Sequence, residues 1–194
     1  MKDLESLQTP HLHLSRMTAD DLDDLTRMHL DPRVMATLGG VRSAEQTRDW
    51  LERQMGHWER CGFGLWMARE RQTGQFAGRG GLHYIEIDGR EEIEVGYCFL
   101  PDFWGRGLAT ELARESIRAG FSVLNAPELV CFTLTTNHAS QRVMQKAGFR
   151  YSRDLLYKDL PHVLYRLRRE EWQPARFVVS KDAGEGESRR EREQ

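Results

Sequence analysis

Apolar positions in the first third of the chain recur at helical spacing. Residues 18–31 carry an apolar residue at every third or fourth position behind a capping-box pattern, and Pro32 ends this stretch because the residue before a proline disfavours the helical region. Residues 43–61 repeat the pattern behind a second capping box, and Gly62 follows them. A short alternating run at 11–15 comes before both. We therefore predict a strand followed by two helices.

The spacing then changes to the period of β-strands. Residues 63–70 and 76–87 are rich in apolar and β-favouring residues, and Asp88-Gly89 is a strong hairpin signal before a further run at 92–100. These residues predict an antiparallel meander of three strands.

The second half alternates between the two periods. Helical stripes cover 108–124 and 137–148, and between them 129–135 is nearly all apolar, as expected of a central buried strand. Residues 149–157 and 163–168 predict a closing pair of strands. The whole pattern is typical of one mixed α/β domain without an internal repeat.

Composition limits the possible functions. The chain has 194 residues with 28 basic and 30 acidic side chains, so it lacks the positive excess that binding nucleic acid by charge alone requires. It has no apolar run long enough to span a membrane and no visible signal peptide. Three cysteines without a CxxC pair argue against a disulfide framework or a cysteine-based metal site, and favour a cytoplasmic protein.

The same patterns divide the chain into three parts. We expect a flexible N-terminus at 1–10, the folded domain at 11–173, and a disordered charged tail at 174–194, where almost nothing is apolar. We leave open whether the domain is a monomer or a homodimer.

The strongest chemical signal is a glycine turn between a strand and a helix. Residues 94–100 lead into Gly105-Arg106-Gly107, and a helix begins directly afterwards. Glycines permit close approach to a ligand, and the free amides of a first helical turn attract anions, so this turn is a candidate pyrophosphate site. The alternative is a helix cap without a ligand. The P-loop and dinucleotide-binding patterns are both absent, and the cluster at 78–81 predicts a bend or bulge.

A second motif gives the turn its context. Residues 104–111 read Trp-Gly-x-Gly-x-Ala-Thr-Glu, and 137–149 read Asn-x-x-Ser-x-x-Val-x-x-Lys-x-Gly-Phe. Together they resemble the GCN5-related N-acetyltransferase (GNAT) superfamily, and more narrowly its ribosomal-protein (RimJ/RimL-like) branch. The resemblance implies the GNAT fold, with helices on both faces of a mostly antiparallel sheet that contains one splayed parallel strand pair.

The resemblance also implies a cosubstrate, acetyl-CoA, and no metal. The backbone of 97–100 would bind the pantetheine arm, the loop at 104–110 the pyrophosphate, and the start of the next helix would lie near the thioester. The cofactor-binding residues implied in this way are Tyr97, Phe99, Leu100, Trp104, Gly105, Arg106, Gly107, Leu108, Ala109, Thr110, Asn137 and Ser140.

Two residues are candidates for catalysis. Glu94 would accept the proton of the amine through water, a modest task for an α-amine, of which roughly a tenth is already neutral at pH 7. The alternatives are an exposed strand residue paired to a base, and Glu92 as the base instead. Ser140 would donate to the departing sulfur, or would only cap backbone. No tyrosine is evident for that role.

We therefore predict transfer of an acetyl group from acetyl-CoA to a primary amine, either a protein N-terminus or a small molecule, by direct attack. A catalytically inactive CoA or acyl-CoA sensor of the same fold is the alternative.

Overall fold

Strands and helices occupy most of residues 4–173, the part of the chain that the computed structural model describes. The strands are β1 Ser6–Gln8, β2 Leu12–Arg16, β3 Leu65–Glu70, β4 Phe76–Ile87, β5 Arg90–Phe99, β6 Glu128–Leu134, β7 Arg150–Tyr157 and β8 Leu160–Arg168. The helices are α1 Leu22–Leu30, α2 Pro32–Met35, α3 Ala44–Cys61, α4 Leu108–Ser122 and α5 His138–Ala147.

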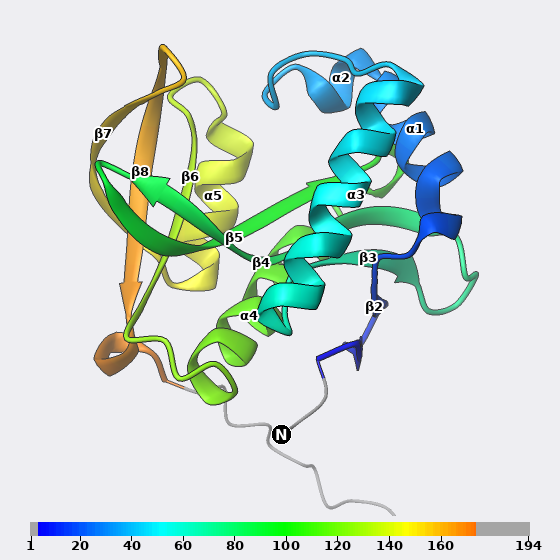
Figure 1. Ribbon diagram of the computed structural model, residues 1–194. Coiled ribbons are helices and arrows are strands. Elements are labelled where there is room, and N and C mark those ends of the chain that lie inside the picture. Colours follow the sequence, from blue (N-terminus) through cyan, green and yellow to red (C-terminus); the bar gives the residue numbers. More distant parts are fainter. Residues whose placement is uncertain (1–3, 174–194) are drawn as a thin grey trace, which may run out of the picture.

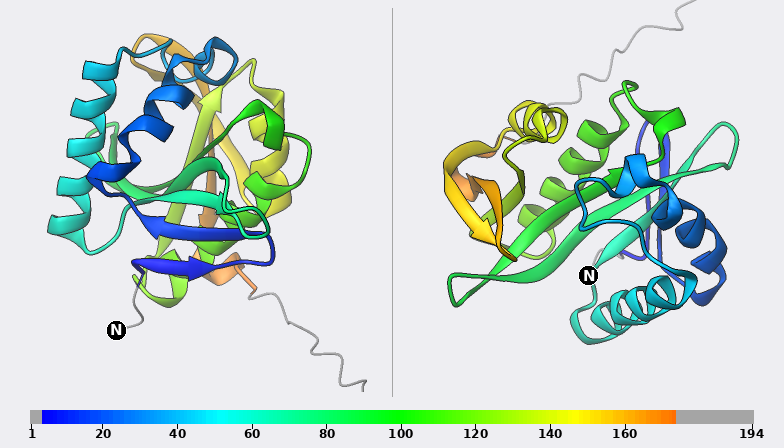
Figure 2. Two further views of the ribbon diagram at one scale, coloured as in Figure 1. Left: turned by 90° about the vertical axis from the view of Figure 1, so that its right-hand side faces the viewer. Right: turned by 90° about the horizontal axis from the view of Figure 1, so that it is seen from above.

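All eight strands belong to one sheet, in the order β1-β2-β3-β4-β5-β6-β8-β7. Every neighbouring pair is antiparallel except β5 and β6, which are parallel. Helices α1 to α3 lie on one face of the sheet and α4 and α5 on the other (Figures 1 and 2). The predicted α/β architecture is confirmed. None of the helices within 4–173 is long and apolar enough to cross a membrane.

The parallel pair separates almost as soon as it forms. Its register holds a single pair, Glu94 opposite Val130, whereas β4 and β5 are paired over ten positions. Beyond Glu94, β5 runs to Phe99 without a partner on its β6 side. Backbone groups on that edge are therefore available to a ligand.

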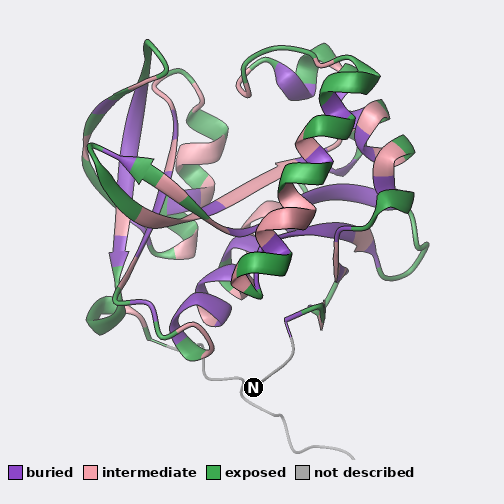
Figure 3. Ribbon diagram, in the orientation of Figure 1, coloured by how far each residue is buried: buried purple, intermediate pink, exposed green. Residues whose placement is uncertain are grey.

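Apolar clusters hold the two helical layers to the sheet, and β3 and β8 are buried along most of their length (Figure 3). The cluster under α1 to α3 contains Leu25, Met28, Val34, Met35, Leu51, Leu65, Met67 and Phe76. The larger cluster, under α4, includes Leu82, Val95, Leu108, Leu112, Ala113, Ile117 and Leu129. The sheet is thus covered on both faces, and a ligand must enter where the strands part.

The glycine cluster in β4 lies where strands approach closely. A Cβ atom at Gly78 would come within 2.3 Å of the carbonyl oxygen of Cys98, and one at Gly80 within 2.6 Å of that of Gly96. The pairing of β3 with β4 shifts register at Ala68, opposite the start of this cluster. The predicted irregularity is therefore present.

The first ten residues correct one prediction. We expected a flexible terminus, but Ser6–Gln8 pair with β2, and Leu4 is only 5% exposed. The indole Nε1–H of Trp66 donates to the carbonyl oxygen of Leu4 at 2.7 Å. Glu111 of α4 also holds the N-terminal segment, because its carboxylate accepts a hydrogen bond from the backbone N–H of His11 at 2.8 Å. The short helix α2 was also not predicted, and the predicted tail at 174–194 lies outside the described residues.

Candidate active site

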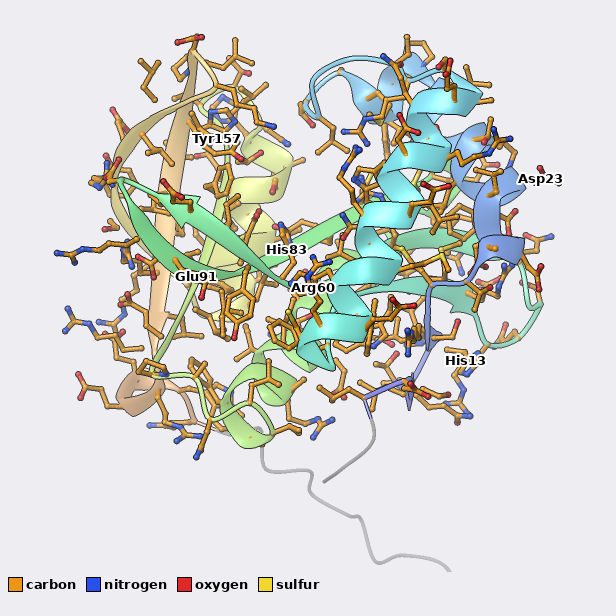
Figure 4. All side chains as sticks on the ribbon, in the orientation of Figure 1. His13, Asp23, Arg60, His83, Glu91 and Tyr157 are labelled. Atoms are coloured by element: carbon orange, nitrogen blue, oxygen red, sulfur yellow. The ribbon has the colours of Figure 1, made fainter. Side chains whose placement is uncertain are left out.

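A cleft of about 1010 Å³ opens where β5 and β6 diverge. The loop at 104–110 and the start of α5 form one end of the cleft, and β4 and β5 form its floor. The loop after α2 and the turn between β7 and β8 form the other end. Figure 4 shows His83 between the layer of α1–α3 and the strands β6–β8, with Tyr157 on β7. The cleft therefore connects the two faces of the sheet.

The predicted glycine turn borders this cleft. Gly105 and Gly107 have φ angles of 73° and 81°, and a Cβ at either would meet no atom within 4 Å. Gly107 is the N-cap of α4 and provides no side chain to cap it, so the amides of the first turn face the cleft unpaired by the helix. The 15-residue helix adds partial positive charge at this end. The turn has the chemistry of a phosphate-binding site.

Two predicted cofactor residues point elsewhere. Arg106 does not line the cleft, and its guanidinium forms an ion pair with Glu70. Leu100 does not line it either, and its N–H donates to the carbonyl oxygen of Ala77 at 2.9 Å. The structure therefore gives no role in the cleft to either side chain.

Trp104 lines the cleft with 51% of its surface exposed. Its indole Nε1–H donates to the carbonyl oxygen of Phe99 at 2.7 Å. Since that oxygen lies on the unpaired edge of β5, the indole occupies one of the acceptors that the separation of the strands exposes. Phe99, Leu108, Ala109 and Thr110 also line the cleft, as predicted.

The start of α5 decides between the two interpretations of Ser140. Asn137 is the N-cap, and its Oδ1 accepts the N–H of Ser140 at 3.1 Å, while its Nδ2 donates to Thr133 at 3.0 Å. The cap is thus supplied by Asn137. The hydroxyl of Ser140 instead lies 3.0 Å from the hydroxyl of Tyr97.

Tyr97 is the residue whose side chain we did not anticipate. We predicted only a backbone contact, but its hydroxyl lies between the hydroxyl and the carbonyl oxygen of Ser140, at 3.0 and 3.1 Å. Burial raises the pKa of Tyr97 well above its usual range, so the phenol stays protonated. Strand alternation was the available signal, because Tyr97 is on the face of β5 opposite to that of Glu94.

Glu94 and Glu92 lie on the same strand face but have different partners. Glu92, the alternative base, pairs with Arg166 at 2.9 Å, whereas a pairing to a base is what we considered as the alternative role of Glu94. Glu94 has 12% of its side chain exposed, lines the cleft, and lies 3.0 Å from Nε2 of His83. His83 keeps its Nδ1 buried without a hydrogen-bond partner among residues 4–173. The Glu94–His83 pair is thus the acid–base pair in the cleft.

Within residues 4–173, no group of three His, Cys, Asp or Glu side chains is arranged to hold a metal ion. Two cations of α5 do line the cleft, Arg142 and Lys146, one helical turn apart. We had identified Lys146 only as part of a motif.

Comparison with known proteins identifies the family. The acetyltransferase (GNAT) domain matches residues 11–150. The chain is 32% identical over 149 residues to YkkB, an uncharacterised protein of Bacillus subtilis, covering 75% of this chain and 87% of YkkB. It is 29% identical over 191 residues to the FsC-acetyl coenzyme A-N(2)-transacetylase of Aspergillus fumigatus, covering 86% of this chain and 77% of the relative.

Solved structures agree with this assignment at the level of the fold. An acetyltransferase from Agrobacterium tumefaciens superimposes with a TM-score of 0.74 at 24% identity, covering 84% of this chain and 94% of that one. The ribosomal-protein-S5-alanine acetyltransferase of Vibrio fischeri superimposes with a TM-score of 0.70 at 17% identity, covering 87% and 99%. The chain belongs to the GNAT family of acetyltransferases and is an acyltransferase.

Proposed function

We propose that the protein transfers an acetyl group from acetyl-CoA to a primary amine by direct attack. The observation that carries the proposal is the separation of β5 from β6 directly after Glu94, which places an acid–base pair, an uncapped helix N-terminus and an unpaired strand edge in one cleft. Direct transfer requires orientation, a neutral amine and a donor for the leaving group, and the cleft contains a candidate for each.

The cosubstrate would lie at the α4 end of the cleft. The amides that follow Gly105 and Gly107 fit the pyrophosphate, and the unpaired edge of β5 from Tyr97 to Phe99 fits the amide groups of the pantetheine arm. When bound, acetyl-CoA supplies an activated acetyl group and a thiolate leaving group. The name of the Aspergillus relative, which mentions acetyl coenzyme A, supports this choice.

Glu94 receives the proton of the amine, directly or through water. The carboxylate is held in place by His83 at 3.0 Å and lines the cleft, where its negative charge attracts a positive amine. Glu92 is already bound to Arg166, so we assign it a structural role. His83 acts on Glu94 and is a positioning residue.

The hydroxyl pair of Tyr97 and Ser140 serves the leaving group. The phenol has one proton and two acceptors in reach, the carbonyl oxygen and the hydroxyl of Ser140. When Tyr97 donates to the hydroxyl, the Ser140 proton is free to point at a thiolate, and burial keeps the phenol protonated. This assignment retains Ser140 as the donor and adds Tyr97 behind it.

The resemblance to ribosomal-protein acetyltransferases also bears on the class of acetyl acceptor. The Trp104–Glu111 loop supports that branch, as does the fold shared with the Vibrio fischeri enzyme. We propose a protein N-terminal α-amine or a small-molecule amine as acceptor, in the reducing cytoplasm that three free cysteines favour.

Substitution of the two catalytic candidates tests the proposal against the inactive sensor. In the double variant Glu94→Gln/Ser140→Ala we expect acetyl-CoA to raise the melting temperature as in the wild type, while thiol release with an accepted amine falls by at least about 100-fold. Glu91→Gln, an exposed change on the same strand, is the matched control and should keep full turnover. Absence of acetyl-CoA binding at millimolar concentration would refute the proposal, and unchanged turnover in the double variant would refute the assigned roles.

A further inference from the structure

Arg79 is a buried cation without a partner. It is 8% exposed, lines the cleft, and has neither a hydrogen bond nor an ion pair within residues 4–173. Its Nε is buried without a hydrogen-bond partner. Burying a charge that has no hydrogen-bonded partner costs several kcal/mol, so such a group in a cleft is a candidate to bind an anion.

The residues around Arg79 add positive charge and no free acid. The guanidinium lies 4.3 Å from the ring centre of Trp50, and that of Arg42 lies 5.9 Å from the same ring. His29, which contacts both Trp50 and Arg42, has its pKa lowered to about 3 by burial and by the two arginines, so it is neutral. The thiol of Cys98 also has its pKa raised by burial and stays protonated. This group of residues therefore attracts an anion.

The nearest acid that acts on Arg79 is Glu94, which already has a partner. In the β4–β5 register Arg79 is opposite Cys98 and His83 is opposite Glu94, so both pairs project from the same face of the sheet. Four residues separate them along each strand, about 13 Å. Between the pairs the register places Gly81 opposite Gly96. Of these two, Gly96 lines the cleft, and a Cβ atom there would lie 3.5 Å from Cε1 of His83.

The floor formed by β4 and β5 thus carries groups of opposite charge at two places. Glu94 and His83 lie at one end, where the strands part and the amine must react. Arg79 lies at the other end, towards the loop after α2. A molecule that lies on this floor meets a carboxylate under its amine and a cation under its far end.

We propose that Arg79 binds a carboxylate of the acceptor, so that the substrates are amines that carry a carboxylate. The inference rests on the proposed acetyl transfer and narrows its acceptor. A carboxylate matches the planar guanidinium and cancels its single charge, whereas a phosphate monoester would bring about −1.5 to −2 into a buried space. The guanidinium of Arg79 lies over the ring of Trp50, which helps to hold it in position.

Matched amines test the proposal on the wild-type protein. Each amino acid in a panel of α-amino and ω-amino acids is compared with its own carboxamide, with acetyl-CoA saturating and thiol release as the readout. We expect the free acid of at least one pair to have a kcat/KM roughly 10- to 100-fold higher than its amide, the range for a hydrogen-bonded charged group. Amidation makes an amine less basic and leaves more of it neutral, so this preference cannot come from the nucleophile.

A substitution then assigns the preference to Arg79. In Arg79→Met the ratio between acid and amide should fall towards one, mainly through the KM of the acid, while Arg90→Met, an exposed change outside the cleft, should keep the ratio. Acetyl-CoA-dependent stabilisation is measured on each variant to show that it is folded.

The outcomes separate this proposal from the one on which it rests. Acetyl transfer to amides and simple amines as fast as to every free acid overturns the role of Arg79 and leaves the acetyltransferase intact. An acid preference that persists in folded Arg79→Met also overturns it. Acetyl-CoA binding without acetylation of any free acid of the panel also overturns the role of Arg79, whereas failure to bind acetyl-CoA refutes the proposed function itself.

Discussion

Acidification should destabilise this protein through His29, a residue buried on α1 beside the cleft. Its side chain is fully buried, its Nδ1 lies 3.2 Å from the hydroxyl of Thr47, and its Nε2 lies 3.4 Å from Nη1 of Arg42. Burial, and after it the charges of Arg79 and Arg42, together lower the pKa of His29 from 6.5 to about 3. A neutral ring can accept the N–H of Arg42, whereas a protonated ring would add a third cation.

The sign of the effect follows from proton binding. Above pH 6.5 neither the folded nor the unfolded chain protonates His29. Below it the unfolded chain binds a proton that the folded chain refuses until pH 3, so the free energy of unfolding falls as the pH falls. The slope approaches about 1.4 kcal/mol per pH unit. Between pH 7.5 and 5.0 the loss is about 2 kcal/mol, and it approaches about 5 kcal/mol near pH 3.

Urea unfolding at a series of pH values measures this loss. The wild type should lose about 2 kcal/mol more than His29→Gln between pH 7.5 and 5.0, because glutamine removes the titrating group. His138→Gln, at an exposed position, should follow the wild type. Arg79→Met should reduce the loss measured near pH 3, since it removes one of the charges that lower the pKa of His29 in the folded chain. Identical pH dependence in the wild type and His29→Gln would refute the reasoning.

Four further substitutions separate roles in the cleft from roles in the fold. Tyr97→Phe should lower kcat roughly 10- to 100-fold at unchanged acetyl-CoA affinity, and steady-state kinetics giving a wild-type kcat would contradict the donor role. Gly107→Ala and Gly62→Ala, at φ 81° and 72°, should each lower the free energy of unfolding by about 1–2 kcal/mol, measured by thermal unfolding. Only Gly107→Ala should weaken the binding of acetyl-CoA in a titration. Equal affinities of the two variants for acetyl-CoA would count against the phosphate site. Glu111→Gln should lower the free energy of unfolding by about 1 kcal/mol at pH 7 and by less at pH 4. The reason is that hydrogen bonds from the β1–β2 connection outweigh burial and lower the pKa of Glu111. Urea unfolding that gives the same loss at both pH values would contradict this.

The sequence predicts elements well where the signal is local. The helix at 43–61 begins and ends at its capping residues because Ser43 and Gln46 satisfy each other's amides, and Gly62 adopts the left-handed conformation at the end. The hairpin at Asp88-Gly89 has positive φ at both positions, as that dipeptide favours. β1 was missed, since three residues paired along one edge carry almost no periodic pattern.

The hairpin between β4 and β5 determines more of the site than we predicted from it. A two-residue turn at Asp88-Gly89 fixes the register of β4 and β5, and that register alone places His83 opposite Glu94. The position of Tyr97 on the other face follows from alternation in the same strand. The pairing of His83 with Glu94 and the strand face of Tyr97 could therefore both have been predicted from the sequence. Arg106 shows the opposite case, because its pairing with Glu70 depends on how a loop folds back on β3 and has no local signal.

The two halves of the cleft differ in the kind of information that specifies them. The half proposed for the cosubstrate depends on backbone, on glycines with positive φ and on a helix N-terminus, and consecutive residues specify each of these properties. The Arg79 site brings together β4, the loop after α2 and Trp50 of α3, which meet only once the helical layer packs on the sheet. A motif can therefore indicate the reaction of this chain, whereas the choice of acceptor depends on tertiary contacts. Among those contacts, a buried charge without a hydrogen-bonded partner is the clearest indication of an acceptor site.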